Sequence, residues 1–121
     1  MRLERMVKAT VAALEDIKAR DIVVLNVSKI TSMFDRMIIA SADSTRQTKA
    51  LAGNVQEKLK ALGAKVYGVE GEQSGEWILV DLGDVVVHIM QPAVREYYNL
   101  EQLWGTTTRR KARRAATGAE S

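Results

Sequence analysis

Residues 77–90 show the alternation of a β-hairpin whose two faces differ. The sequence WILVDLGDVVVHIM has Gly83-Asp84 as a two-residue turn between two apolar runs. Pairing across this turn gives one wholly apolar face, formed by Ile78, Val80, Leu82, Val85, Val87 and Ile89. The opposite, mixed face carries Trp77, Leu79, Asp81, Val86, His88 and Met90. Because a core needs only one apolar face, the mixed face is predicted to contact another molecule.

The composition is that of one globular domain. A chain of 121 residues can bury a core without cross-links, and 46% of its residues are hydrophobic. It has no Cys, which excludes disulfides and thiolate sites. Neither a secretory signal at the N-terminus nor an apolar run of the ~18 residues that a membrane span needs is apparent. We therefore expect a cytoplasmic protein that does not contact membranes.

The positive charge of the chain is concentrated at its C-terminus. Five of the 18 Lys and Arg residues lie within residues 105–121, against one acidic residue. Residues 1–104 hold the other 13 Lys and Arg residues and 14 acidic residues, so the net charge of this part is close to zero. The prediction is a folded domain over 1–104 and a basic, disordered tail over 105–121. The tail lacks aromatic residues for base stacking, so it is expected to solubilise the protein or to contact RNA phosphates without sequence preference.

Hydrophobic periodicity predicts the order α-β-β-α-β-β-β-α. The predicted elements are a helix over about 3–19, strands near 21–27, 35–41 and 65–70, a helix from Asp43 or Ser44 to Gly63, the hairpin, and short helices from Pro92 and Asn99. A strand–helix–strand crossover over 36–70 beside an antiparallel hairpin gives an α/β fold with a mixed, roughly five-stranded sheet. Two long helices cover one sheet face, so the other face is expected to stay partly open.

An enzymatic alternative uses Asp81, Asp84 and His88. A histidine beside a carboxylate can act as a general base, and two carboxylates can bind a hard cation. However, no nucleophile or Gly-rich loop accompanies them, and two oxygens are few for a metal site. We therefore predict no catalytic residue, no metal and no cofactor. Ser44-Thr45-Arg46 begins a helix and is interpreted as a cap and not as a phosphate site, because no Gly-rich loop precedes it.

Several segments together carry a family resemblance. They are Glu70-Gly71, the run from Trp77 to His88, and the spaced residues Arg95, Tyr97, Tyr98, Leu100, Glu101, Leu103 and Trp104. Asp35 to Ile39 followed by Ser44-Thr45-Arg46 fits the same pattern. Over about residues 3–104 the chain resembles the ribosome silencing factor family, the Iojap-like proteins.

The resemblance implies a nucleotidyltransferase-like fold without catalysis. It also implies binding to the large ribosomal subunit through the protein numbered fourteen in the large-subunit series. Such binding blocks joining of the small subunit and represses translation when nutrients are scarce. The expected partner-binding residues are Trp77, Leu79, Asp81, His88 and Met90, together with Glu70, Arg95 and Tyr98. Self-association as a homodimer that hides Trp77 is left open, as is an RNA-binding module that works through the tail.

Overall fold

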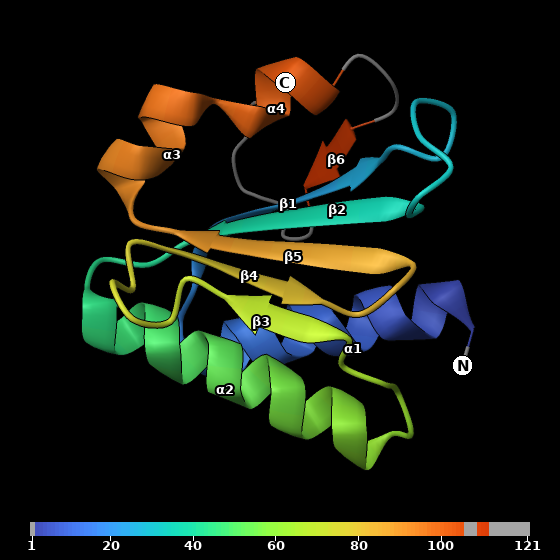
Figure 1. The fold of residues 1–121 in the computed structure, drawn as a ribbon, viewed down its shortest axis with the longest axis horizontal. Coiled ribbons are helices and arrows are strands. Elements are labelled where there is room, and N and C mark those ends of the chain that lie inside the picture. Colours follow the sequence, from blue (N-terminus) through green and yellow to red (C-terminus); the bar gives the residue numbers. More distant parts are fainter. Residues whose placement is uncertain (1, 106–108, 112–121) are drawn as a thin grey trace.

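The computed structural model describes residues 2–105 and 109–111 of the chain. They form one mixed sheet with the strand order β3-β4-β5-β2-β1-β6 and helices on both of its faces (Figure 1). The elements are α1 (Leu3–Asp16), β1 (Arg20–Asn26), β2 (Arg36–Ser41), α2 (Thr45–Ala61), β3 (Gly68–Glu70), β4 (Trp77–Asp81), β5 (Val85–Met90), α3 (Pro92–Tyr98), α4 (Leu100–Trp104) and β6 (Arg109–Lys111). The predicted α/β class is confirmed, and β6 adds a sixth strand.

The hairpin has the predicted register. Trp77 pairs with Met90 and Asp81 with Val86, and the Leu82 amide donates to the Val85 carbonyl at 2.9 Å. β5 is parallel to β2, whereas the other strand pairs are antiparallel. β3 therefore runs in the same direction as β2, as the predicted crossover requires, but the hairpin lies between these two strands. The expected similarity to nucleotidyltransferases stays a prediction.

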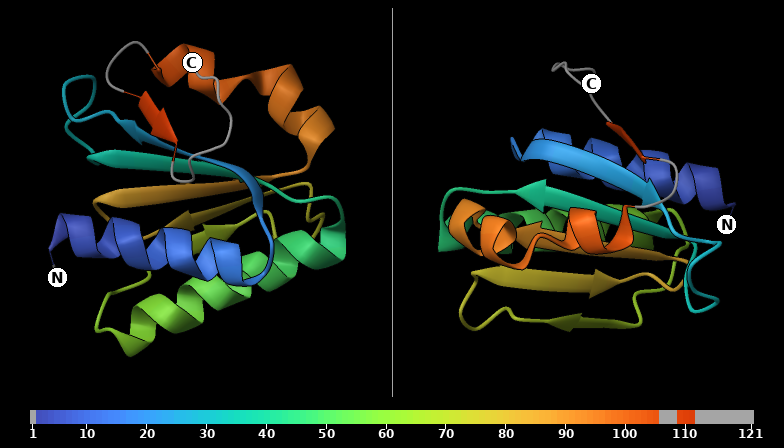
Figure 2. Two further views of the ribbon diagram at one scale, coloured as in Figure 1. Left: turned by 180° about the vertical axis from the view of Figure 1, so that it is seen from behind. Right: turned by 90° about the horizontal axis from the view of Figure 1, so that it is seen from above.

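Helices α1 and α2 cover one face of the sheet. Figure 2 shows both helices crossing this face side by side. The apolar face of the hairpin packs beneath them. The large core residues of α2 are Leu51, Val55 and Leu59, all fully buried. Gly63 has φ +93°, a conformation that favours glycine, and follows the end of α2 as predicted. This face accounts for the larger of the two cores.

Ser44 is the N-cap of α2. Its hydroxyl oxygen accepts a hydrogen bond from the Gln47 amide at 3.1 Å. Replacing Ser44 by alanine should lower the free energy of unfolding by about 1 kcal/mol, because one amide of the first turn loses its acceptor. Urea denaturation measures this change. Ser32→Ala, in an exposed loop position, is the control and should leave the midpoint unchanged; an equal effect of the two replacements would contradict the capping role.

Helices α3 and α4 lie on the opposite face and cover part of it (Figures 1 and 2). A second, smaller core forms there around Leu25, Ile39 and Met90, with Leu100 and Trp104 of α4 packed against it. This face is therefore less open than the sequence suggested. The short C-terminal helices were predicted, but their position over the sheet was not.

Residues 109–111 form β6, which pairs with Val23–Leu25 at the edge of β1. Disorder was expected over all of 105–121, so for these three residues a paired strand replaces the predicted tail. An extended segment close to the β1 edge gains backbone hydrogen bonds that an unpaired edge lacks. Residues 106–108 and 112–121, including Arg113 and Arg114, lie outside the described residues. Among the helices of the described part, none is long and apolar enough to span a membrane.

Candidate protein-interaction surface

An apolar cleft of about 460 Å³ opens on the second face of the sheet, where α3 and α4 leave it uncovered. We call it the hairpin cleft. It is lined by Met33, Phe34, Met37, Tyr67, Leu79, Asp81, Gly83, Val86, His88, Leu100 and Trp104. Most of these side chains are apolar, so the cleft fits an apolar group of a partner better than a polar ligand.

The floor of the hairpin cleft comes from the mixed face of the hairpin. Strand register puts Leu79 opposite His88 and Asp81 opposite Val86, with all four side chains on this face. The predicted orientation of Leu79, Asp81 and His88 toward the second face is thus correct. Leu79 is half-buried, and therefore keeps part of its surface for a partner.

The walls of the cleft come from segments far apart in the sequence. Phe34, in the loop between β1 and β2, packs on Trp104 of α4 with ring centroids 5.7 Å apart. Met33 is 81% exposed and Tyr67 is 61% exposed, so two large side chains are accessible at the rim. The Lys65 ammonium lies over the Tyr67 ring, 5.0 Å from its centroid. Sequence reasoning missed these wall residues. A signal was present for Met33 and Phe34, because these two large apolar residues lie outside the strands that were predicted near 21–27 and 35–41.

Trp77, His88 and Tyr98 form one contact network beside the cleft. The Trp77 indole Nε1 donates to Nδ1 of His88 at 2.9 Å, and the Trp77 and Tyr98 rings lie 4.9 Å apart. Since Nδ1 accepts this bond, the neutral ring carries its proton on Nε2. Burial lowers the pKa of His88 from 6.5 to about 4. His88 is therefore uncharged near neutral pH and orients Trp77.

Met90 does not belong to the exposed surface. It was predicted to point outward with Trp77 and Leu79, but its side chain is fully buried in the second core. The pairing placed Met90 on the correct face, and the C-terminal helices then cover that part of the face. Trp77 is half-buried for the same reason, because Tyr98 of α3 packs on its ring. Tyr98 itself is 53% exposed and remains available to a partner.

Arg95 is buried and has a structural role in place of the predicted partner contact. Its guanidinium makes a bidentate pair with the Glu101 carboxylate, with N–O distances of 3.0 and 2.9 Å. Nη1 donates to the Asp21 carbonyl and to the Ser41 hydroxyl, each at 2.8 Å. A single side chain of α3 thereby connects α4, β1 and β2. Glu70, by contrast, is exposed at the edge of the sheet.

The segment that forms β3, β4, β5 and their loops is acidic throughout. Residues 66–94 contain five Asp and Glu residues and no Lys or Arg. Asp81 lines the hairpin cleft, while Glu70, Glu72 and Glu76 are exposed. An apolar cleft that Asp81 lines, with a floor from a segment that contains no Lys or Arg, favours a partner that combines an apolar anchor with basic groups.

The residues of the enzymatic alternative do not form a metal centre. Asp81 uses a carboxylate oxygen to accept the Gly83 amide at 2.9 Å, and Asp84 is exposed in the turn. The acceptor nitrogen of His88 is occupied by Trp77. Within residues 2–105 and 109–111, no three His, Asp or Glu side chains lie close enough together to hold a metal ion.

Fold and site together define a small α/β domain with an open apolar cleft on one face of its sheet. The chain matches the family model described as "Ribosomal silencing factor during starvation" over residues 1–120. It is 58% identical over 105 residues to the ribosomal silencing factor RsfS of Chromobacterium violaceum, which covers 87% of this chain and 86% of the relative. The chain belongs to the ribosomal silencing factor family.

More distant relatives and a solved structure agree with this assignment. The mouse protein named "Mitochondrial assembly of ribosomal large subunit protein 1" is 35% identical over 97 residues, which are 78% of this chain and 42% of that protein. A crystal structure of a protein from Chromobacterium violaceum superposes with a TM-score of 0.86 at 55% identity, covering 96% of this chain and 97% of the other. The predicted family is therefore confirmed.

Proposed function

We propose that this protein binds the large ribosomal subunit through its protein number fourteen and sterically blocks the small subunit from joining. Translation is then repressed under nutrient limitation, without catalysis, in the cytoplasm where subunits join. The hairpin cleft is the site of contact, with Leu79 and Trp104 against an apolar anchor of the partner. The acidic residues around the cleft face basic groups of the ribosomal protein.

One observation carries this proposal: the floor of an open apolar cleft comes from residues 66–94, a segment whose charged residues are all acidic. Ribosomal proteins must bind RNA phosphates and are generally basic, so they complement such a segment. The family description names silencing during starvation, and the mouse relative is named for assembly of the large subunit. The family description supports repression during starvation, and the name of the mouse relative supports the large subunit as the target.

Replacing Leu79 by glutamate should weaken binding to isolated large subunits at least about 10-fold, because a charge replaces part of the apolar floor. Co-sedimentation with large subunits, small subunits and whole ribosomes measures the affinity. The wild-type protein should bind free large subunits and lower the yield of joined ribosomes, whereas Leu79→Glu should not. Trp77→Ala is a poorer probe, since it also removes the contacts to His88 and Tyr98.

Ala12→Glu is the matched control for the added charge. Ala12 is exposed on α1, on the other side of the sheet, and its replacement should leave the affinity unchanged. A folded Leu79→Glu protein that sediments with large subunits as the wild type does would refute the placement. Binding of magnesium and a nucleotide by the isolated protein would instead favour the enzymatic alternative with Asp81, Asp84 and His88.

A further inference from the structure

The outer face of α2 carries a stripe of basic residues. Arg46, Lys49, Gly53, Gln56 and Lys60 follow one another at spacings of three, four, three and four residues, which puts all five on one side of the helix. We call this set the α2 stripe. Its three cations are exposed, and they belong to none of the ion pairs within the described part of the chain. The stripe contains no acidic residue.

Two features of the α2 stripe weaken the helix that carries it. Gly53 lies in mid-helix without a positive φ, and a Cβ at this position would meet no atom within 4 Å. Neither backbone conformation nor packing requires glycine there, although glycine destabilises a helix relative to alanine. Arg46 lies in the first turn, which has no acidic residue and where the helix dipole disfavours a cation. The stability of the helix therefore does not account for Gly53 and Arg46.

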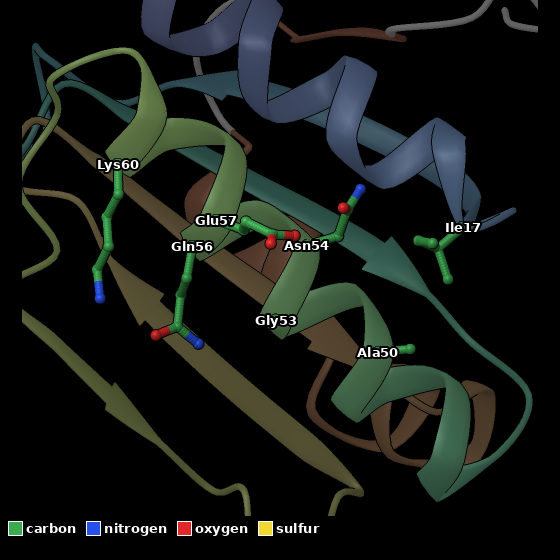
Figure 3. Close-up of a pocket in the computed structure, with 7 residues that line it drawn as sticks. All are labelled: Ile17, Ala50, Gly53, Asn54, Gln56, Glu57 and Lys60. Carbon is green, nitrogen blue, oxygen red and sulfur yellow. The ribbon is translucent and has the colours of Figure 1, made fainter.

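The surface is hollowed around Gly53. A groove of about 600 Å³ is lined by Ile17, Ala50, Gly53, Asn54, Gln56, Glu57 and Lys60 (Figure 3). Figure 3 shows Gln56 and Lys60 on the side of α2 that points away from α1. Asn54 points toward α1, where its amide donates to the Ala13 carbonyl at 2.8 Å. Another molecule can thus approach the α2 backbone at Gly53, with stripe cations on either side along the helix and the Glu57 carboxylate as the one acidic group that lines the groove.

Charge is segregated between two consecutive segments of the chain. Residues 45–65 hold five Lys and Arg residues and one Glu, whereas the following residues 66–94 hold five acidic residues and no basic ones. The α2 stripe lies on the opposite side of the sheet from the hairpin cleft. It extends over 15 residues, from Arg46 to Lys60, or about 21 Å along the helix axis. Its length and charge fit several successive phosphates of a polyanion.

We propose that the α2 stripe binds the phosphate backbone of large-subunit RNA. This contact is separate from the hairpin cleft, and its place on the ribosome rests on the proposed function. Arg46 and Lys49 neutralise phosphates at one end of the stripe and Lys60 at the other. Gly53 lets the RNA backbone come close to the helix between them. Contact at both faces holds the protein on the subunit more firmly than the cleft alone.

A triple replacement of the stripe cations by glutamine tests the proposal in the full-length protein. Arg46→Gln, Lys49→Gln and Lys60→Gln remove the charge but keep good helix formers. The probe is large-subunit RNA stripped of protein, titrated at several salt concentrations. The Kd should rise at least about 10-fold at moderate salt, and the slope of log Kd against log salt should fall by about two, as expected for the loss of two to three phosphate contacts.

A matched triple variant controls for net charge. Arg5→Gln, Lys8→Gln and Lys29→Gln remove three exposed cations outside the stripe and should change the Kd less than about 3-fold. The C-terminal arginines are common to all variants and contribute equally. An equal loss in the two triple variants would overturn the proposal, because only net charge would then matter. Weaker binding to large subunits with unchanged binding to the stripped RNA would also overturn it and would assign the stripe to an acidic protein.

Gly53→Gln separates RNA contact from helix stability. The longer side chain fills the groove, so RNA binding should weaken several-fold while the melting temperature rises. A rise in melting temperature with unchanged RNA affinity would contradict a close approach at Gly53.

The proposal for the hairpin cleft and the proposal for the α2 stripe can be refuted independently. Leu79→Glu should lose large-subunit binding but keep binding to stripped RNA, whereas the stripe variant should keep binding to the isolated ribosomal protein number fourteen. If the stripe variant binds stripped RNA as the wild type does, this inference fails and the proposed function stands. If Leu79→Glu binds large subunits normally and the stripe variant does not, the placement at the cleft fails and the RNA contact stands.

Discussion

Replacing Arg95 by alanine is expected to lower the free energy of unfolding by about 3 to 5 kcal/mol, the range for a buried ion pair that loses one partner. The pair is well buried, with 10% of the Arg95 side chain and 16% of the Glu101 side chain exposed. Without the guanidinium, the Glu101 carboxylate and the Ser41 hydroxyl lose the donors seen here. Urea denaturation gives the change in stability.

Two further measurements make the Arg95 prediction specific. Arg95→Lys keeps the charge but cannot reproduce the bidentate pair, so it should lose less than Arg95→Ala and still clearly destabilise. Both tryptophans of the chain, Trp77 and Trp104, contact the region that Arg95 holds. Their emission should therefore shift to longer wavelength in Arg95→Ala below the main unfolding transition. A loss below about 1 kcal/mol with unchanged emission would mean that α3 and α4 are held mainly by apolar packing.

Acidification from pH 7.5 to pH 4 should cost the wild-type protein about 3 kcal/mol of stability through His88 alone. Burial lowers the pKa of this side chain from 6.5 to about 4 in the folded protein. The unfolded chain therefore binds a proton below pH 6.5 while the folded protein does not. The stabilisation is fully present above pH 6.5 and is lost as the pH falls toward 4, where Nδ1 must also give up the Trp77 hydrogen bond.

His88→Asn is the control for this pH dependence. Its side-chain oxygen can replace Nδ1 as the acceptor for Trp77, but it does not titrate. His88 is the single histidine of the chain, and the carboxylates titrate in both proteins, so the difference between the two stability curves isolates it. Parallel curves between pH 7.5 and pH 4 would show that His88 is not protected from solvent in the folded protein.

The hairpin register could be predicted because neighbouring residues in the sequence determine it. A two-residue turn at Gly83-Asp84 fixes which residues pair, and strict alternation then assigns each side chain to a face. The helices were predictable for the same reason, since Ser44 and Gly63 are signals at the ends of α2. The family resemblance rests on these same local patterns and is confirmed by the matches to known proteins.

The partner surface was predicted only in part because exposure depends on what packs above a strand. Leu79 and Met90 lie on the same face, yet Leu79 is half-buried in the cleft and Met90 is fully buried under the C-terminal helices. The exposure of Arg95, a charged residue, could not be predicted from the sequence either. Its sequence position suggested a surface contact, but its partners Asp21, Ser41 and Glu101 are brought together only by the folded chain.

The sequence by itself determined the α/β class, the hairpin with its two faces and the family of this protein. Alternation, turn residues and helix caps act over a few residues, so they can be seen without a structure. Only the tertiary structure decided where the mixed face stays open. That outcome depends on α3, α4 and the loop with Met33 and Phe34 meeting over the sheet, and these contacts join residues dozens of positions apart. The hairpin cleft exists because this cover is incomplete.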